Sequence, residues 1–146
     1  MSDIRHRLGI FASQGEVHHA IATTEGVASW WNRTTAGDAT EGGKLELTFR
    51  EPDRLVLEVL EATPERIEWR CLEGPEEWLP TSFTFELAAQ GDETVLLFAH
   101  GGWLESVAFQ ARCSTKRAYF LVGMKAMLEG GEATRFPGEL QISSWG

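Results

Sequence analysis

The sequence has few cysteines and no long apolar segment. Cys71 and Cys113 are its only cysteines, and they lie far apart with no Cys-x-x-Cys spacing. Neither a disulfide framework nor a zinc knuckle is predicted, and both residues are expected to be ordinary buried or half-buried thiols. No apolar run approaches the roughly 18 residues of a transmembrane helix, and no signal-peptide pattern follows Met1. A cytoplasmic protein is therefore expected.

Positive charge is also scarce. The chain carries 13 Lys and Arg against 22 Asp and Glu, which gives a formal net charge of −9. Non-specific nucleic-acid binding requires Lys and Arg that neutralise phosphates, and an anionic membrane surface makes the same demand. We therefore expect neither nucleic acid nor membrane as a partner, whereas the charge leaves a small neutral ligand open.

Motifs of metal, cofactor and serine-hydrolase sites are missing as well. No set of His, Cys and carboxylate residues stands at a metal-ligand spacing. The glycine pairs at 42–43, 101–102 and 130–131 form neither a dinucleotide-binding motif nor a phosphate-binding loop. No Gly-x-Ser-x-Gly elbow is present. We expect no metal and no cofactor.

Apolar aromatic residues, by contrast, are abundant: six Trp and eight Phe accompany a single Tyr. Trp30 and Trp31 are adjacent, at the end of a segment whose Thr23 or Thr24 can cap a short helix. Neighbours on a helix point about 100° apart. We therefore expect one indole to enter the core or pack against a sheet while the other lines a cavity or its entrance.

The periodicity predicts a single domain over residues 1–146 with an α+β fold. One strand (4–10) is followed by two short helices, then by antiparallel strands joined by short turns, and then by a long helix from Glu105 to Glu129. Residues 132–146 are expected to form a C-terminal tail. A curved antiparallel sheet wrapped around the long helix would bury both apolar faces, and the gap between them is a natural place for an apolar cavity.

The order of elements and several local patterns resemble the helix-grip superfamily of START-type and birch-pollen-allergen-type domains. The branch it is most similar to contains bacterial polyketide-cyclase-like proteins and relatives of the C-terminal domain of a chaperone-ATPase activator. The patterns that carry the resemblance are Glu16-Val17 with Ala20-Ile21, Thr24 to Val27, Trp30-Trp31, Gly42 to Leu45, His100 to Trp103, and Phe120 to Gly131. The resemblance implies a helix-grip fold with a cavity between sheet and helix, but not a ligand.

The candidate ligand contacts are residues expected on the inner face of this fold. They are Trp31, Phe49, Trp69, Phe83, Phe85, Phe98, His100, Trp103, Phe120 and Met124. The same residues could simply fill the core, and the sequence does not separate the two roles. Arg112, Lys116 and Arg117 share one side of the long helix, and we expect that side to face solvent because long cations are rarely buried without partners.

Histidines offer a second hypothesis. His100 shares strand parity with Leu96 and Phe98, and with Glu105 nearby it could act as a general acid or base. His18 and His19 are adjacent on a helix and are expected at the surface. Three functions follow: binding of a small hydrophobic or amphipathic molecule, which we favour; a cyclase- or hydrolase-like enzyme using His100; and a chaperone-interacting module. A monomer or a homodimer is expected.

Overall fold

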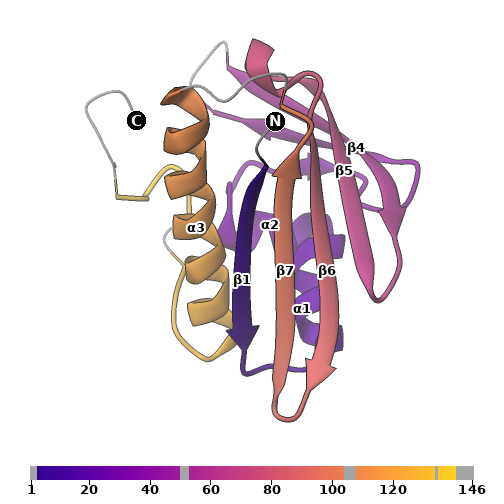
Figure 1. Cartoon of the computed structure of the whole chain (residues 1–146), viewed down its shortest axis with the longest axis vertical. Coiled ribbons are helices and arrows are strands. Elements are labelled where there is room, and N and C mark those ends of the chain that lie inside the picture. The colour runs from indigo at the N-terminus through magenta and orange to yellow at the C-terminus, as the bar shows by residue number, and fades with distance from the viewer. Residues whose placement is uncertain (1–2, 50–52, 104–107, 134, 141–146) are drawn as a thin grey trace.

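The computed structural model describes residues 3–49, 53–103, 108–133 and 135–140. In these residues one seven-stranded antiparallel sheet, with the strand order β1-β7-β6-β5-β4-β3-β2, curves around three α-helices (Figure 1). The elements are β1 (Ile4–Ile10), α1 (Gln14–Ala22), α2 (Thr24–Trp30), β2 (Ala36–Gly37), β3 (Lys44–Thr48), β4 (Arg54–Ala62), β5 (Arg66–Glu73), the 3-10 turn η1 (Glu76–Trp78), β6 (Ser82–Gln90), β7 (Glu93–Gly101) and α3 (Ala108–Leu128). The predicted α+β helix-grip architecture is confirmed.

Short-range capping decides where the first helix begins. Helix α1 begins at Gln14 because the Ser13 hydroxyl accepts a hydrogen bond from the Glu16 amide and the Glu16 carboxylate reaches back to Ser13. The sequence analysis missed β2 and η1, which are too short to show a period. Helix α3 is described from Ala108, so the predicted start at Glu105 lies outside the described residues.

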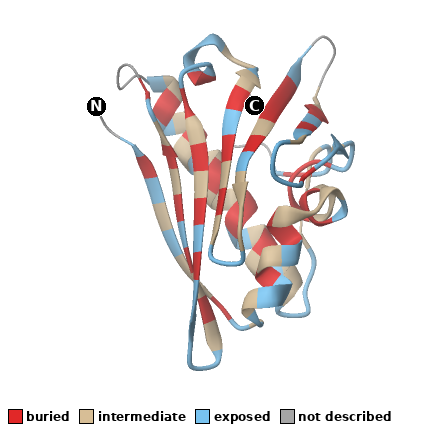
Figure 2. Ribbon diagram, turned by 90° about the vertical axis from the view of Figure 1, so that its right-hand side faces the viewer, coloured by how far each residue is buried: buried red, intermediate tan, exposed pale blue. Residues whose placement is uncertain are grey.

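Strand alternation sets the two faces of the sheet, as the banding of buried residues in Figure 2 shows. In the antiparallel register Trp69 of β5, Phe83 of β6 and His100 of β7 are direct neighbours. All three are buried on the face turned towards the helices. The opposite face of β6 and β7 carries Ser82, Thr84 and the exposed Leu97. The inner face of the sheet is therefore almost wholly apolar and the outer face mixed.

The two adjacent tryptophans are both buried, each 3% exposed, which corrects the expectation that one of them lies at a cavity entrance. Their rings stack at 5.9 Å between centroids with an interplanar angle of 16°. Both rings can be buried because they meet different neighbours: Trp30 reaches α1, and the Trp31 ring centroid lies 6.2 Å from that of Trp69 on β5. The Trp30 indole N–H donates to the Ala20 carbonyl at 2.8 Å.

The crossing of α1 and α2 depends on Gly26. A Cβ at this position would overlap the backbone carbonyl oxygen of His19 and lie 2.7 Å from the Cα of Ala20. We expect Gly26→Ala to lower the free energy of unfolding by about 1–3 kcal/mol, because backbone cannot move aside as a flexible side chain can. Urea denaturation measures this loss.

Gly15→Ala is the matched control, since Gly15 also lies in a helix but its nearest neighbour to a new Cβ is the Ser13 hydroxyl at 4.0 Å. There alanine should stabilise by about 0.5–1 kcal/mol through its better helix propensity. Equal effects at the two positions would contradict this packing account.

Two further predictions can be compared with the fold. Cys71 and Cys113 are both free and buried, as expected. Burial raises the pKa of the Cys71 thiol to about 11. No helix in the described part of the chain is both long enough and apolar enough to span a bilayer.

Candidate functional site

Aromatic side chains form a continuous layer on the inner face of the sheet. The predicted ligand contacts in this inner aromatic layer are Trp31, Trp69, Phe83, Phe85, Phe98, His100 and Trp103, all at most 3% exposed. Ring centroids lie 4.0 Å apart between Phe83 and His100, and 4.8 Å apart between Trp69 and Phe85. The rings touch one another, so these residues pack as a core, and a ligand among them would have to separate them.

The other three predicted contacts take different places. Phe120 and Met124 are buried on the face of α3 that joins the same core. Phe49 follows β3 and is only half-buried, with its ring 5.0 Å from that of Phe136 in the C-terminal tail. The described part of the predicted tail is held in place, because the Phe136 amide donates to the Trp31 carbonyl at 2.9 Å.

His100 lies at the centre of the layer, fully buried and without a described carboxylate in hydrogen-bond contact. Its Nε2 is 2.9 Å from the Thr81 hydroxyl, which itself donates to the Trp78 carbonyl at 2.6 Å. Because that hydroxyl proton is used, Nε2 must carry the imidazole proton, and Nδ1 remains an acceptor with no partner among the described residues.

Burial, together with the charge of Arg117, lowers the pKa of His100 to about 2. The imidazole is therefore neutral across the physiological range. A general acid or base works best with a pKa near the operating pH, so this environment favours a hydrogen-bonding role. Glu105, the carboxylate proposed to assist His100, lies outside the described residues.

Arg117 overturns the expectation that the basic cluster on α3 faces solvent. It is 7% exposed and lies on the inner side of the helix, whereas Lys116 pairs with Glu139 at 3.8 Å at the edge of the core. The Arg117 guanidinium carbon lies 4.9 Å from the Trp31 ring centroid. Burial lowers the pKa of Arg117 to about 10, which leaves it charged at neutral pH.

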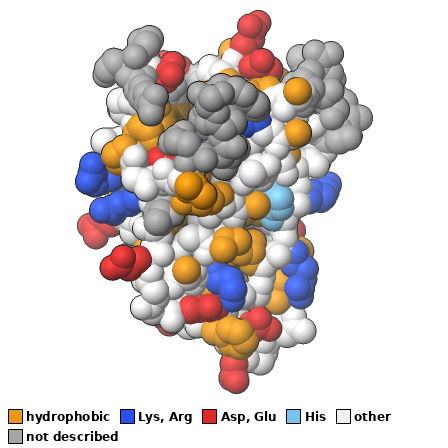
Figure 3. Space-filling view, turned by 90° about the vertical axis from the view of Figure 1, so that its left-hand side faces the viewer, with side chains coloured by type: hydrophobic (Ala, Val, Ile, Leu, Met, Phe, Trp, Pro, Cys, Tyr) orange, Lys and Arg blue, Asp and Glu red, His pale blue; other side chains and the backbone are white. Residues whose placement is uncertain are grey.

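Sequence reasoning missed Arg117 although the signal was present. Cys113, Arg117, Phe120 and Met124 follow one another at spacings of three and four, so they form one helical stripe, and all are buried. The prediction of a solvent-facing side chain followed from the residue type, a long cation, and not from the position of Arg117 in this buried stripe. Basic, acidic and apolar side chains mix on the surface that carries α3 (Figure 3), and Arg117 does not belong to that solvated set.

Trp78 was missed for a different reason. Its neighbours Glu76 and Glu77 made the segment look like a charged loop, yet the Trp78 side chain is 6% exposed. Its ring centroid lies 5.2 Å from that of His100. The 3-10 turn η1 turns this indole inward, and no periodic pattern in three residues could have shown that.

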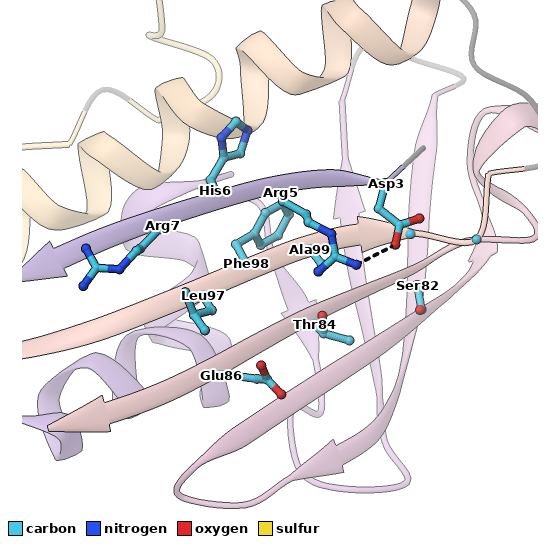
Figure 4. A pocket seen from close by; sticks show the side chains of 12 residues that line it. Asp3, Arg5, His6, Arg7, Ser82, Thr84, Glu86, Leu97, Phe98 and Ala99 are labelled. Carbon is cyan, nitrogen blue, oxygen red and sulfur yellow. Dashed lines mark hydrogen bonds and ion pairs between the residues drawn. The ribbon is translucent and has the colours of Figure 1, made fainter. Parts of the chain in front are cut away.

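A separate hollow of about 540 Å³ lies on the outer face of β1, β7 and β6 (Figure 4). Asp3, Arg5, Arg7, Thr84, Glu86, Leu97 and Ala99 are among the residues that line it. Asp3 and Arg5 form an ion pair at 3.3 Å, while His6 points to the other side of β1, towards α3. This outer hollow is open and is lined by polar and apolar side chains alike, unlike the enclosed, mainly apolar clefts that hold hydrophobic molecules.

No protein-family model matches the sequence, and no curated protein matches it. Solved structures do match. The Aha1 dimer from Colwellia psychrerythraea is 32% identical with a TM-score of 0.81, and the match covers 90% of this chain and 98% of that one.

Two further matches are more distant in sequence and show the fold alone. CalU16 from Micromonospora echinospora is 20% identical with a TM-score of 0.74, over 94% of this chain and 69% of that one. The protein SSP2350 from Staphylococcus saprophyticus is 17% identical with a TM-score of 0.73, over 92% and 97%. The 32% identity to the Aha1 dimer over nearly the whole of both chains, together with the curved sheet and the long C-terminal helix, shows that the chain belongs to the helix-grip superfamily, in the branch that contains the Aha1 homologues.

Proposed function

We propose that the protein binds a small hydrophobic or amphipathic molecule between the inner aromatic layer and α3. The observation that supports this is a group of buried polar atoms that have no hydrogen-bond partner among the described residues, in an otherwise apolar region: Nε1 of Trp31, Nε1 of Trp69 and Nδ1 of His100. Each such atom costs about 1–3 kcal/mol when left unpaired. A bound molecule with a few polar atoms would satisfy them and place its apolar body against the rings.

Binding at this place requires α3 to separate from the sheet, since Arg117 of α3 already lies against the rings of Trp31 and Phe83. Helix α3 packs against the edge strand β1 and against α1 and α2. An edge contact of this kind allows the helix to move without breaking the hydrogen-bonded ladders between β7, β6 and β5. The proposal therefore makes α3 the mobile side of the site and the sheet its fixed side.

The first experiment uses N-phenyl-1-naphthylamine, a neutral aromatic probe whose fluorescence increases in apolar surroundings. We expect saturable binding with a stoichiometry of one probe per chain. Met124 is fully buried on the inner side of α3. Met124→Phe should lower the affinity for the probe by about tenfold, because a bulkier side chain reduces the space that movement of α3 can open.

Leu97→Gln is the matched control. Leu97 is 45% exposed and lines the outer hollow, so this variant should bind the probe as the wild type does. Loss of binding in Leu97→Gln with retention in Met124→Phe would transfer the site to the outer face and contradict the proposal. Whichever face binds the probe, native mass spectrometry of protein purified from its own host would identify any molecule that co-purifies.

A further inference from the structure

Arg117 is a buried cation surrounded by aromatic faces. Its guanidinium carbon lies 4.9, 5.0 and 5.9 Å from the ring centroids of Trp31, Trp78 and Phe83. Cation–π contacts of this kind orient a guanidinium, but they do not neutralise it. Atom Nη1 of Arg117 is buried and has no hydrogen-bond partner in the part of the chain that the structure describes.

No carboxylate balances this charge in the described part of the chain. Other cations of this acidic protein have acidic partners: Arg54 with Glu46 at 3.2 Å, Arg66 with Glu61 at 2.7 Å, Arg70 with Glu58 at 2.6 Å and Lys116 with Glu139 at 3.8 Å. The thiol of Cys113, one turn away on α3, is kept neutral because burial raises its pKa. Arg117, the most deeply buried arginine of the described residues, thus has no carboxylate counter-charge among them.

The groups around Arg117 complement one kind of molecule. An acidic group would accept hydrogen bonds from the guanidinium fork, the donor geometry that suits a planar or trigonal anion. The Trp31 indole N–H offers a further donor, and His100 Nδ1 offers an acceptor for a hydroxyl or amine. The faces of Trp31 and Phe83 would contact an aromatic or aliphatic body.

We propose that Arg117 receives the acidic group of the bound molecule, so that the ligand class is a small aromatic or aliphatic acid. This inference rests on the proposed function, because it concerns the same site. It adds the charge and the orientation of the ligand: the acidic end lies at α3 and the apolar body lies along the inner aromatic layer.

The test compares two probes that share one aromatic framework. N-Phenyl-1-naphthylamine is neutral, and 8-anilinonaphthalene-1-sulfonate carries an anionic group on the same framework. We expect Arg117→Met to lower the affinity for the sulfonate probe by about 10- to 100-fold, because the variant loses a charge-assisted hydrogen bond to the sulfonate. The same variant should change the affinity for the neutral probe by less than about threefold. Arg117→Gln, a second uncharged variant, should show the same selective loss if the methionine variant does not fold.

Arg7→Gln is the matched control, because Arg7 is an exposed arginine that lines the outer hollow. It should bind both probes as the wild type does. If Arg117→Met binds the sulfonate probe normally, or if Arg7→Gln loses it instead, the inference is wrong while neutral-probe binding still supports the proposed function. If the wild type binds neither probe, the proposed function fails and the inference fails with it.

Discussion

Replacing Arg117 by methionine is expected to raise the free energy of unfolding by about 2 kcal/mol. The lowering of the Arg117 pKa from 12.5 to about 10 corresponds to about 3 kcal/mol against the charged form in the folded state, at about 1.4 kcal/mol per unit. Contacts with the three rings return about 0.5–2 kcal/mol. Methionine fills a similar space without a charge and keeps apolar contact with the rings. Urea denaturation at neutral pH measures the change.

Arg70→Met provides the comparison for that measurement. Arg70 is exposed and paired with Glu58, and the loss of such a surface pair is expected to change stability by no more than about 0.5–1 kcal/mol. A wild-type residue that reduces stability is the usual sign of a functional position. Arg117→Met could instead lower the free energy of unfolding by more than Arg70→Met does. Arg117 would then stabilise the packing of the aromatic rings, and the stability data would not support its role in anion binding.

Replacing His100 by glutamine is expected to make the protein markedly less sensitive to acid. The pKa of His100 is lowered from 6.5 to about 2 in the folded state, first by burial and then by the charge of Arg117. The unfolded chain therefore binds the proton that the folded chain excludes. The neutral His100 imidazole therefore makes its full contribution to the free energy of unfolding above the unfolded-state pKa. This contribution is lost as the pH falls from 6.5 to about 2.

Between about pH 6.5 and about pH 4.5 the wild type should lose about 2 kcal/mol that His100→Gln does not lose. Denaturant titrations of both proteins at matched pH values give this difference directly. His19→Gln, at an exposed position, should follow the wild-type curve. Parallel curves for wild type and His100→Gln would show that the imidazole gains access to water or to a counter-charge, contrary to the burial described here.

The fold could be predicted because its signals are local and periodic. Alternation at Phe83, Phe85 and Leu87 fixes one face of β6, and the threonines before the tandem Trp indicate the start of α2. The resemblance to helix-grip domains added the arrangement of these elements in space. The prediction of a single domain over 1–146 is an expectation that no comparison addresses.

The site could be predicted only in part, because its features depend on contacts between distant segments. Strand parity correctly placed His100 on the inner face, but the hydrogen bond that fixes its tautomer comes from Thr81, the residue before β6. Arg117 was misplaced because a general rule about long cations was preferred to its position in the stripe. The inward turn of Trp78 and the docking of Phe136 beside Trp31 have no pattern in the sequence.

The central claim is that an amphipathic acid binds between the inner aromatic layer and α3, and the indole N–H signals of the tryptophans test it most directly. The 1H–15N spectrum should be recorded during titration with 8-anilinonaphthalene-1-sulfonate, with each indole assigned by a Trp→Phe variant. The indole signals of Trp31 and Trp69 should shift with saturation, since both N–H groups are buried and have no partner among the residues that the structure describes. The backbone amides of Thr84 and Leu97 in the outer hollow should stay in place. Shifts confined to Thr84 and Leu97, with Trp31 and Trp69 unmoved, would contradict the account.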